Sequence, residues 1–370
     1  MPDYKIPLLP LSFDFENVAI YKQLSAASRA LAELKGVAQT IPNENILLNT
    51  LVLQEAKDSS EVENIVTTQD EVYQADLDMV GTITKAAQKE VIRYREAMHK
   101  GFERVRSNRL LTNAVIKQIQ QALESNKAGF RALPGTSLMD KHGEIVYTPP
   151  QSKDEIEQLM SNLEKFINDP QLSSLDPLIK LPIIHHQFES IHPFYDGNGR
   201  TGRIISILYL VTNGLLDLPI LYLSRYINHN KNRYYSLIQE IRDNAPNNEE
   251  NWVSWIIFVL KGIEETANET VVLIGKIRDL MQEYKQRIRP LFGKKYKHEL
   301  LNNLFKHPYT KIEYIMRDLD VTRQTASKYL EELVSHGIVE KFHLHNTNYY
   351  INRDLYNLFI NQGQMEPKNV

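Results

Sequence analysis

The sequence predicts a mainly α-helical protein with more than one domain. Apolar residues recur at helical spacing over most of the chain, and strand-like patterns occur only near residues 143–148 and 338–351. At 370 residues the chain is long for one hydrophobic core, so two or three domains are expected.

Composition excludes several classes of protein. The 43 basic and 46 acidic side chains nearly cancel, so no overall field favours nucleic acid or a membrane surface. The absence of cysteine excludes disulfides, thiolate metal sites and thiol catalysis. No apolar run is long enough to span a bilayer, and the proline-punctuated N-terminus does not have the pattern of a signal peptide. We therefore expect a cytoplasmic protein that does not bind membranes.

Residues 1–104 are expected to form an N-terminal helical segment. Amphipathic patterns predict a helix over 17–35 that stops at Gly36, a second helix over 44–55 and a long helical region over 70–100. Between the last two, Ser60 and Glu63 have the spacing of a capping box, with Ser60 as the N-cap of a helix near 59–70. Local pattern alone favours that structural interpretation of Glu63.

Residues 105–265 are expected to form the central domain. Helices are predicted over 110–123 and 154–168, with a hairpin between them that turns at His142-Gly143 and is stopped by two prolines. Asp176-Pro177 is a typical helix start, and the helix that follows leads to residue 191. Pro182 lies within it, which predicts a kink or a restart.

The stretch from 191 to 203 combines a glycine turn with the start of a helix. Gly197 and Gly199 allow positive φ angles, which turn backbone N–H groups toward one point. A helix is predicted from about Asn198 to the stop signal at Asn213-Gly214. The N–H groups of its first turn would favour a phosphate.

Four side chains of this stretch carry the chemistry. Arg200 and Arg203 are three apart on one helix face, so both can reach the same phosphate. Asp196 offers a hard oxygen ligand for magnesium, and His192 could take a proton from a hydroxyl as a neutral imidazole. A zinc cluster of His192 with His185 and His186 is rejected, because residues seven apart lie about 10 Å from each other on a helix.

These residues fill every specified position of HxFx(D/E)GNGRxxR, and the stretch thus resembles the signature of the Fic family. The resemblance implies transfer of AMP from ATP to a protein hydroxyl, with His192 as the general base and Asp196 as the magnesium ligand. The ATP-binding residues that it implies are Glu63, Asp196, Gly197, Asn198, Gly199, Arg200, Thr201, Gly202, Arg203 and Tyr234. For Tyr234, a packing role is an equal alternative.

Further features match the same family. Ser59, Glu63 and Asn64 fill the pattern (S/T)xxxE(G/N) of an inhibitory helix, whose glutamate pairs with the second motif arginine, here Arg203. With the Fic motif downstream, this interpretation of Glu63 replaces the capping box as the favoured one. The hairpin resembles the family's flap, which holds a target segment by strand addition through Glu144, Ile145, Val146 and Tyr147.

The remaining chain is expected to form a connector and a small module. An apolar helix over 252–260 closes the core, and a charged helix over 266–295 connects it to residues 296–370. The module has the order of a winged helix, with three helices and a hairpin, and Thr322 opens a helix that resembles a recognition helix. Because glutamates offset its basic residues, protein contact or domain packing is favoured over DNA binding.

The expected fold is thus a Fic-type helical core with a hairpin flap, an N-terminal helical segment and a C-terminal winged-helix-like module. The expected function is that of an autoinhibited adenylyltransferase using ATP and magnesium on a tyrosine, serine or threonine hydroxyl of a target protein, and on itself. Open alternatives are transfer of another group, removal of AMP, and a DNA-binding regulator that senses nucleotide. The sequence leaves the target and any homo-oligomer open.

Overall fold

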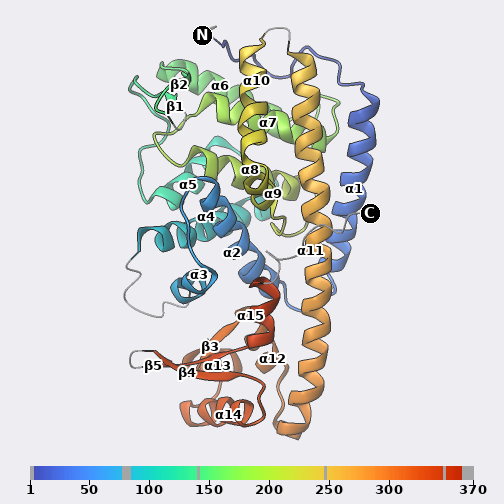
Figure 1. The fold of residues 1–370 in the computed structure, drawn as a ribbon, viewed down its shortest axis with the longest axis vertical. Coiled ribbons are helices and arrows are strands. Elements are labelled where there is room, and N and C mark those ends of the chain that lie inside the picture. The colour runs from blue at the N-terminus through green and yellow to red at the C-terminus, as the bar shows by residue number, and fades with distance from the viewer. Residues whose placement is uncertain (1–3, 77–84, 140–141, 246–247, 345–346, 361–370) are drawn as a thin grey trace.

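A computed structural model describes residues 4–76, 85–139, 142–245, 248–344 and 347–360. It is mainly helical, as predicted, and elongated (Figure 1). Its longest element is the 44-residue helix α11, Glu249–Phe292, which runs along the long axis beside α1, Val18–Ala38. The helix predicted over 252–260 and the connector over 266–295 therefore belong to one helix. Pro290 lies in its last turn, and the helix ends at Phe292.

The first helices differ from prediction mainly at their ends. Asn17 caps α1 through its side chain, but the helix continues past Gly36. The second helix, α2, spans Glu44–Val62 and is longer than predicted. Ser60 lies within it and donates a hydrogen bond from Oγ to the carbonyl of Ala56. The capping-box interpretation was wrong, since Ser60 lies in the last turn of α2 and not at the start of a helix.

The long helical region predicted over 70–100 is represented by two helices. These are α3, Gln69–Asp76, and α4, Ala86–Asn108. The predicted apolar positions Leu77, Val80 and Ile83 lie outside the described residues.

The central part consists of helices packed around α7 and α8. Its elements are α5, Asn113–Glu124; α6, Lys153–Asn168; α7, Pro177–Ile191; α8, Asn198–Thr212; α9, Leu223–His229; and α10, Lys231–Asp243. Asp176 caps α7 as predicted, whereas α7 continues through Pro182 without the predicted restart. The predicted hairpin is present as β1, Leu138–Met139, paired with β2, Ile145–Tyr147.

The C-terminal module has the predicted helices and hairpin. They are α12, His298–Lys306; α13, Ile312–Leu319; α14, Arg323–Ser335; β4, Glu340–Leu344; and β5, Thr347–Ile351. Two elements were not predicted, namely β3, Tyr309–Lys311, and α15, Arg353–Ile360. The three strands form an antiparallel sheet in the order β3-β5-β4.

The module packs against the N-terminal helices (Figure 1). Tyr73 of α3 lies against the rings of Tyr309 and Tyr356, at centroid distances of 5.9 and 6.1 Å. Asp70 accepts hydrogen bonds from the hydroxyls of both module tyrosines. Among the described helices, none is long and apolar enough to cross a bilayer.

Candidate functional site

The site is built where α7 ends and α8 begins. His192 follows α7 in a left-handed conformation with φ 47°, and its N–H donates to the carbonyl of Phe188 at 2.9 Å. Gly197 precedes α8 with φ 77°, where a residue with a side chain would be strained. The two turns place His192 and the first N–H groups of α8 on one cavity.

Two buried side chains hold the loop between these turns. Asn198 accepts a hydrogen bond from the N–H of Phe194 at 2.9 Å and donates Nδ2 to the carbonyl of the same residue at 2.8 Å. Arg131 donates Nε to the carbonyl of His192 at 2.8 Å and Nη2 to that of Ile191 at 3.3 Å. Asn198 therefore fixes the loop, and its contact with nucleotide stays a prediction. Arg131 was missed, because it precedes the motif by about sixty residues and sits in a stretch with no pattern of its own.

His192 is held in the state that a general base needs. Burial, and then the charges of Arg131 and Arg242, lower the pKa of His192 to about 4, so its imidazole is neutral at physiological pH. Its Nδ1 atom is buried, so a hydroxyl bound in the cavity would have to reach the other ring nitrogen, Nε2. A neutral imidazole can accept a proton from a bound hydroxyl.

A cavity of about 440 Å³ lies above the start of α8. Its lining comes from the motif and from three other helices or the loops after them, and consists of Glu63, Ile65, Glu90, Glu124, His192, Tyr195, Asp196, Gly197, Asn198, Gly199 and Arg200. Asp196 is exposed there and accepts a hydrogen bond from the N–H of Gly197 at 2.7 Å. Within the described ranges, no three acidic or histidine side chains form a metal cluster.

Arg203 is buried and binds the end of α2. Its Nε donates to Ser59 Oγ at 2.8 Å, and its Nη2 donates to the carbonyl of Ser59 at 2.9 Å and to Glu63 Oε1 at 2.8 Å. A methyl group added at Gly199 would overlap Glu63 Oε1, so this carboxylate lies against the first turn of α8. It occupies the place where the helix N-terminus favours an anion.

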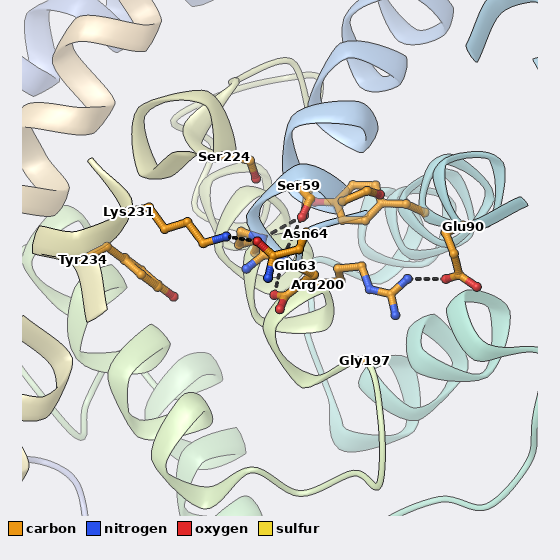
Figure 2. A network of polar contacts seen from close by, with 12 residues as sticks. Ser59, Glu63, Asn64, Glu90, Gly197, Arg200, Ser224, Lys231 and Tyr234 are labelled. Atoms are coloured by element: carbon orange, nitrogen blue, oxygen red, sulfur yellow. Dashed lines mark hydrogen bonds and ion pairs between the residues drawn. The ribbon is translucent and has the colours of Figure 1, made fainter. Parts of the chain in front are cut away.

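The state of Glu63 and the turn after it follow from their neighbours. Burial alone would raise the pKa of Glu63, but the charge and hydrogen bond of Arg203 lower it below the ordinary value, with help from Arg200 and Lys231. Asn64 adopts a left-handed conformation with φ 61° and accepts a hydrogen bond from Lys231 at 2.8 Å (Figure 2). The asparagine or glycine of the pattern thus suits a turn that ends the helix.

Arg200 has two carboxylate partners that were not predicted. Its Nη1 pairs with Glu90 of α4, and its Nη2 pairs with Glu124 of α5 at 2.8 Å. Burial raises the pKa of Glu124, and the charges of Asp196 and Glu90 act in the same direction against that of Arg200. The cavity lining therefore contains four carboxylates and one arginine, Arg200, while one of the carboxylates, Glu63, also pairs with the buried Arg203.

Four of the predicted nucleotide-binding residues lie outside the cavity lining, namely Thr201, Gly202, Tyr234 and the Arg203 already described. Tyr234 is 2% exposed, and its hydroxyl lies 2.7 Å from His185 Nε2, whose ring bonds Ser206 through the other nitrogen. Thr201 is fully buried, and Gly202 packs closely on Phe188. For Tyr234 this arrangement favours the packing alternative.

The hairpin is tied to the helices beside the site. The Tyr147 hydroxyl donates to the carbonyl of Ser190 at 2.8 Å, and the guanidinium of Arg242 lies 4.0 Å from its ring centroid. Gln239 donates to the carbonyl of Val146 at 3.0 Å. Ile145 is 45% exposed. Strand β2 therefore carries one side chain anchored on the helices, that of Tyr147, and one that faces solvent, that of Ile145.

Three family models match successive parts of the chain. They are the Fic/DOC family N-terminal model over residues 21–103, the Fic/DOC family model over 110–210 and the C-terminal domain of SoFic-like protein adenylyltransferases over 280–355. Together they span well over half of the chain. The chain belongs to the Fic family. The middle match contains the whole motif from His192 to Arg203.

Curated relatives match over short stretches. A probable protein adenylyltransferase of Aquifex aeolicus is 40% identical over 72 residues, which is 20% of this chain and 20% of the relative. The protein adenylyltransferase fic-1 of Caenorhabditis briggsae is 34% identical over 76 residues, which is 20% of this chain and 15% of the relative. The chain thus covers a fifth or less of these relatives.

Solved structures show the same fold. A Fic family protein from Desulfovibrio desulfuricans G20 superposes with a TM-score of 0.58 at 18% identity, over 91% of this chain and 97% of that one. A Fic domain containing signaling protein from Bacteroides thetaiotaomicron gives a TM-score of 0.52 at 18% identity, over 70% of this chain and 97% of that one. At these identities the likeness concerns the fold alone.

Proposed function

We propose that this Fic protein is an autoinhibited adenylyltransferase that transfers AMP from ATP to a tyrosine, serine or threonine hydroxyl of a target protein, and to itself. The observation that carries the proposal is the neutral imidazole of His192 on the same cavity as the N-terminus of α8. A base for a hydroxyl and a binding site for phosphate then adjoin. The names of the curated relatives agree with this chemistry.

In the proposed reaction, His192 takes the proton from the target hydroxyl. The hydroxyl oxygen forms a bond to the α-phosphorus of ATP, the bond from that phosphorus to the bridging oxygen breaks, and pyrophosphate leaves. The N–H groups at the start of α8 and the two motif arginines stabilise the negative charge of the phosphates. The flap strand from Glu144 to Tyr147 positions the target segment.

Asp196 is the residue that would hold a magnesium ion. Magnesium in nucleotide sites takes one or two protein carboxylates and completes its shell with phosphate oxygens and water. Asp196 fits, because it is exposed on the cavity and only one of its oxygens is used by the N–H of Gly197. When bound, the ion would neutralise charge on the phosphates.

Glu63 is the proposed inhibitory residue. Its carboxylate binds Arg203 and lies against Gly199, so it competes with a phosphate for both the guanidinium and the helix N-terminus. Removing the carboxylate should free both groups for ATP.

The test is intact-mass analysis of the Glu63→Gly variant after incubation with magnesium and ATP, UTP or CDP-choline in turn. We expect the mass of one or more AMP groups with ATP, faster than in the parent protein, and none when His192→Ala is added. Glu61→Gly is the matched control, because Glu61 lies in the same turn and does not contact Arg203. Undiminished labelling without His192 would exclude it as the base.

The same experiment separates the alternatives. A different added mass would indicate another transferred group, and loss of AMP from a modified protein would indicate removal. A DNA-binding regulator is less well supported, because basic side chains of the module are already paired, Arg323 with Glu313 at 2.7 Å and Lys341 with Glu331 at 2.6 Å. Salt-dependent DNA retention without covalent labelling would favour it.

A further inference from the structure

The two motif arginines are occupied in parallel ways by carboxylates from outside the motif. Arg203 Nη2 pairs with Glu63 Oε1 at 2.8 Å, and Arg200 Nη2 pairs with Glu124 Oε1 at 2.8 Å. The inhibitory pattern of the sequence accounts for the first pair. Nothing in it accounts for the second, whose partner lies at the end of α5.

Each carboxylate also crowds a glycine of the phosphate-binding turn. A methyl group at Gly199 would overlap Glu63 Oε1, and one at Gly197 would overlap Glu124 Oε1. Both oxygens therefore lie against the backbone from which α8 starts. A phosphate approaching that backbone meets a carboxylate at each of the two glycines, and like charges in a partly buried site repel strongly.

Glu90 completes the arrangement around Arg200. The Arg200 side chain is 6% exposed, with Glu90 on Nη1 and Glu124 on Nη2. Figure 2 shows the pair of Arg200 with Glu90. Glu90 also lies 3.4 Å from Arg93, on the next turn of α4. Glu90 therefore keeps a cationic partner if Arg200 moves. Among the side chains of the described residues that bond Glu124, Arg200 is the single cation.

We infer that Glu124 is a second inhibitory carboxylate, which holds Arg200 away from the nucleotide phosphates independently of Glu63. The inference rests on the proposed function, since it concerns the same nucleotide site. Removing Glu63 alone then frees Arg203 but leaves Arg200 paired with Glu124. Nucleotide gains full access to both arginines only when Glu124 has also given up Arg200.

The test measures binding of magnesium and α,β-methylene-ATP by calorimetry, because transfer cannot cleave the methylene bridge of this analogue. The full-length chain is compared as Glu63→Gly and as Glu63→Gly with Glu124→Gln, which keeps the size of the side chain but removes its charge. We expect about tenfold tighter binding in the double variant, which corresponds to about 1.4 kcal/mol. Glu44→Gln in the same background is the matched control, because Glu44 pairs with Arg106 at 2.7 Å far from the cavity, and it should change nothing.

The outcomes separate this inference from the proposed function. If Glu63→Gly binds the analogue and transfers AMP, but Glu124→Gln leaves affinity unchanged, only the second inhibitory role is wrong. Weaker binding would overturn it as well, because Glu124 would then orient Arg200 for phosphate. If Glu63→Gly neither binds nor transfers, the proposed function fails first. Should Glu124→Gln not fold, Glu124→Asp replaces it, since the shorter carboxylate releases Nη2, and severalfold tighter binding is expected.

Discussion

Replacing Arg131 should alter both the stability of the loop between α7 and α8 and the acid–base behaviour of His192. Arg131 is fully buried and donates to the carbonyls of His192 and Ile191. Its charge is also the second largest cause, after burial, of the lowered pKa of His192. Arg131→Met removes the donors and the charge and keeps an unbranched apolar side chain.

The size of both effects follows from these contacts. A hydrogen bond from a charged group is worth about 1.5 to 3 kcal/mol, and the bond to Ile191 is long at 3.3 Å, so the two together contribute roughly 3 kcal/mol. At roughly 2 to 4 °C per kcal/mol, Tm should fall by roughly 6 to 12 °C. The pKa of His192 should rise from about 4 but stay below the ordinary value of 6.5, because burial persists.

The assay is the pH dependence of AMP transfer in a Glu63→Gly background, with Tm measured in parallel. Arg131→Met should lower Tm and move the acid limb of kcat/KM to higher pH, since a base that protonates more readily is lost earlier as pH falls. Arg131→Lys keeps the charge but not the fork of donors, so it should lower Tm with little movement of the acid limb. An unchanged acid limb in Arg131→Met would refute the electrostatic argument, and an unchanged Tm would refute the structural one.

Four further predictions concern other parts of the molecule. The kcat/KM of Glu63→Gly should fall near pH 4 rather than near 6.5, because protonation of His192 is suppressed until about 4. Burial raises the pKa of Glu55 to about 8, so its stabilising effect is complete below its ordinary value of 4.5 and is lost as pH rises through about 8. Tm of the parent protein should therefore fall as pH rises from 4.5 to about 8, and this fall should be absent in Glu55→Gln. Asp70→Ala leaves two tyrosine hydroxyls of the module without their acceptor and should cost roughly 1 to 3 kcal/mol, seen as a lower calorimetric Tm. Glu63→Gly should lower Tm without nucleotide and regain it with magnesium and ATP, whereas a Tm that ignores ATP would contradict a shared site.

Features encoded by neighbouring residues could be predicted from the sequence. Asp176 and Thr322 cap helices as expected, because a side-chain oxygen reaches N–H groups two or three residues away. The motif is equally local, since its turn and its helix start lie within twelve residues of chain. Local pattern had assigned Glu63 to a capping box. The Fic resemblance instead predicted its distant pairing with Arg203, which the structure contains.

The missed residues are those whose partners are remote in the chain. Glu90 lies 110 residues from Arg200, Glu124 lies 76 residues from it, and Arg131 reaches across 61 residues to the carbonyl of His192. In sequence, each is an ordinary charged residue in a helix or a loop. Only the packing of α4 and α5 against α8 brings the two glutamates to one cavity.

Burial of the arginines explains why a site of this kind contains its own anions. Arg203 is 1% exposed, and a guanidinium at that depth is costly unless a negative group pairs with it. In the proposed reaction ATP would fill that role only while it is bound, so the protein without nucleotide needs a carboxylate in the same place. Glu63, and by our inference Glu124, would meet this need at the expense of nucleotide affinity. Inhibition and the stability of the resting fold then have one physical origin, and a variant that opens the site must become more dependent on nucleotide to remain folded.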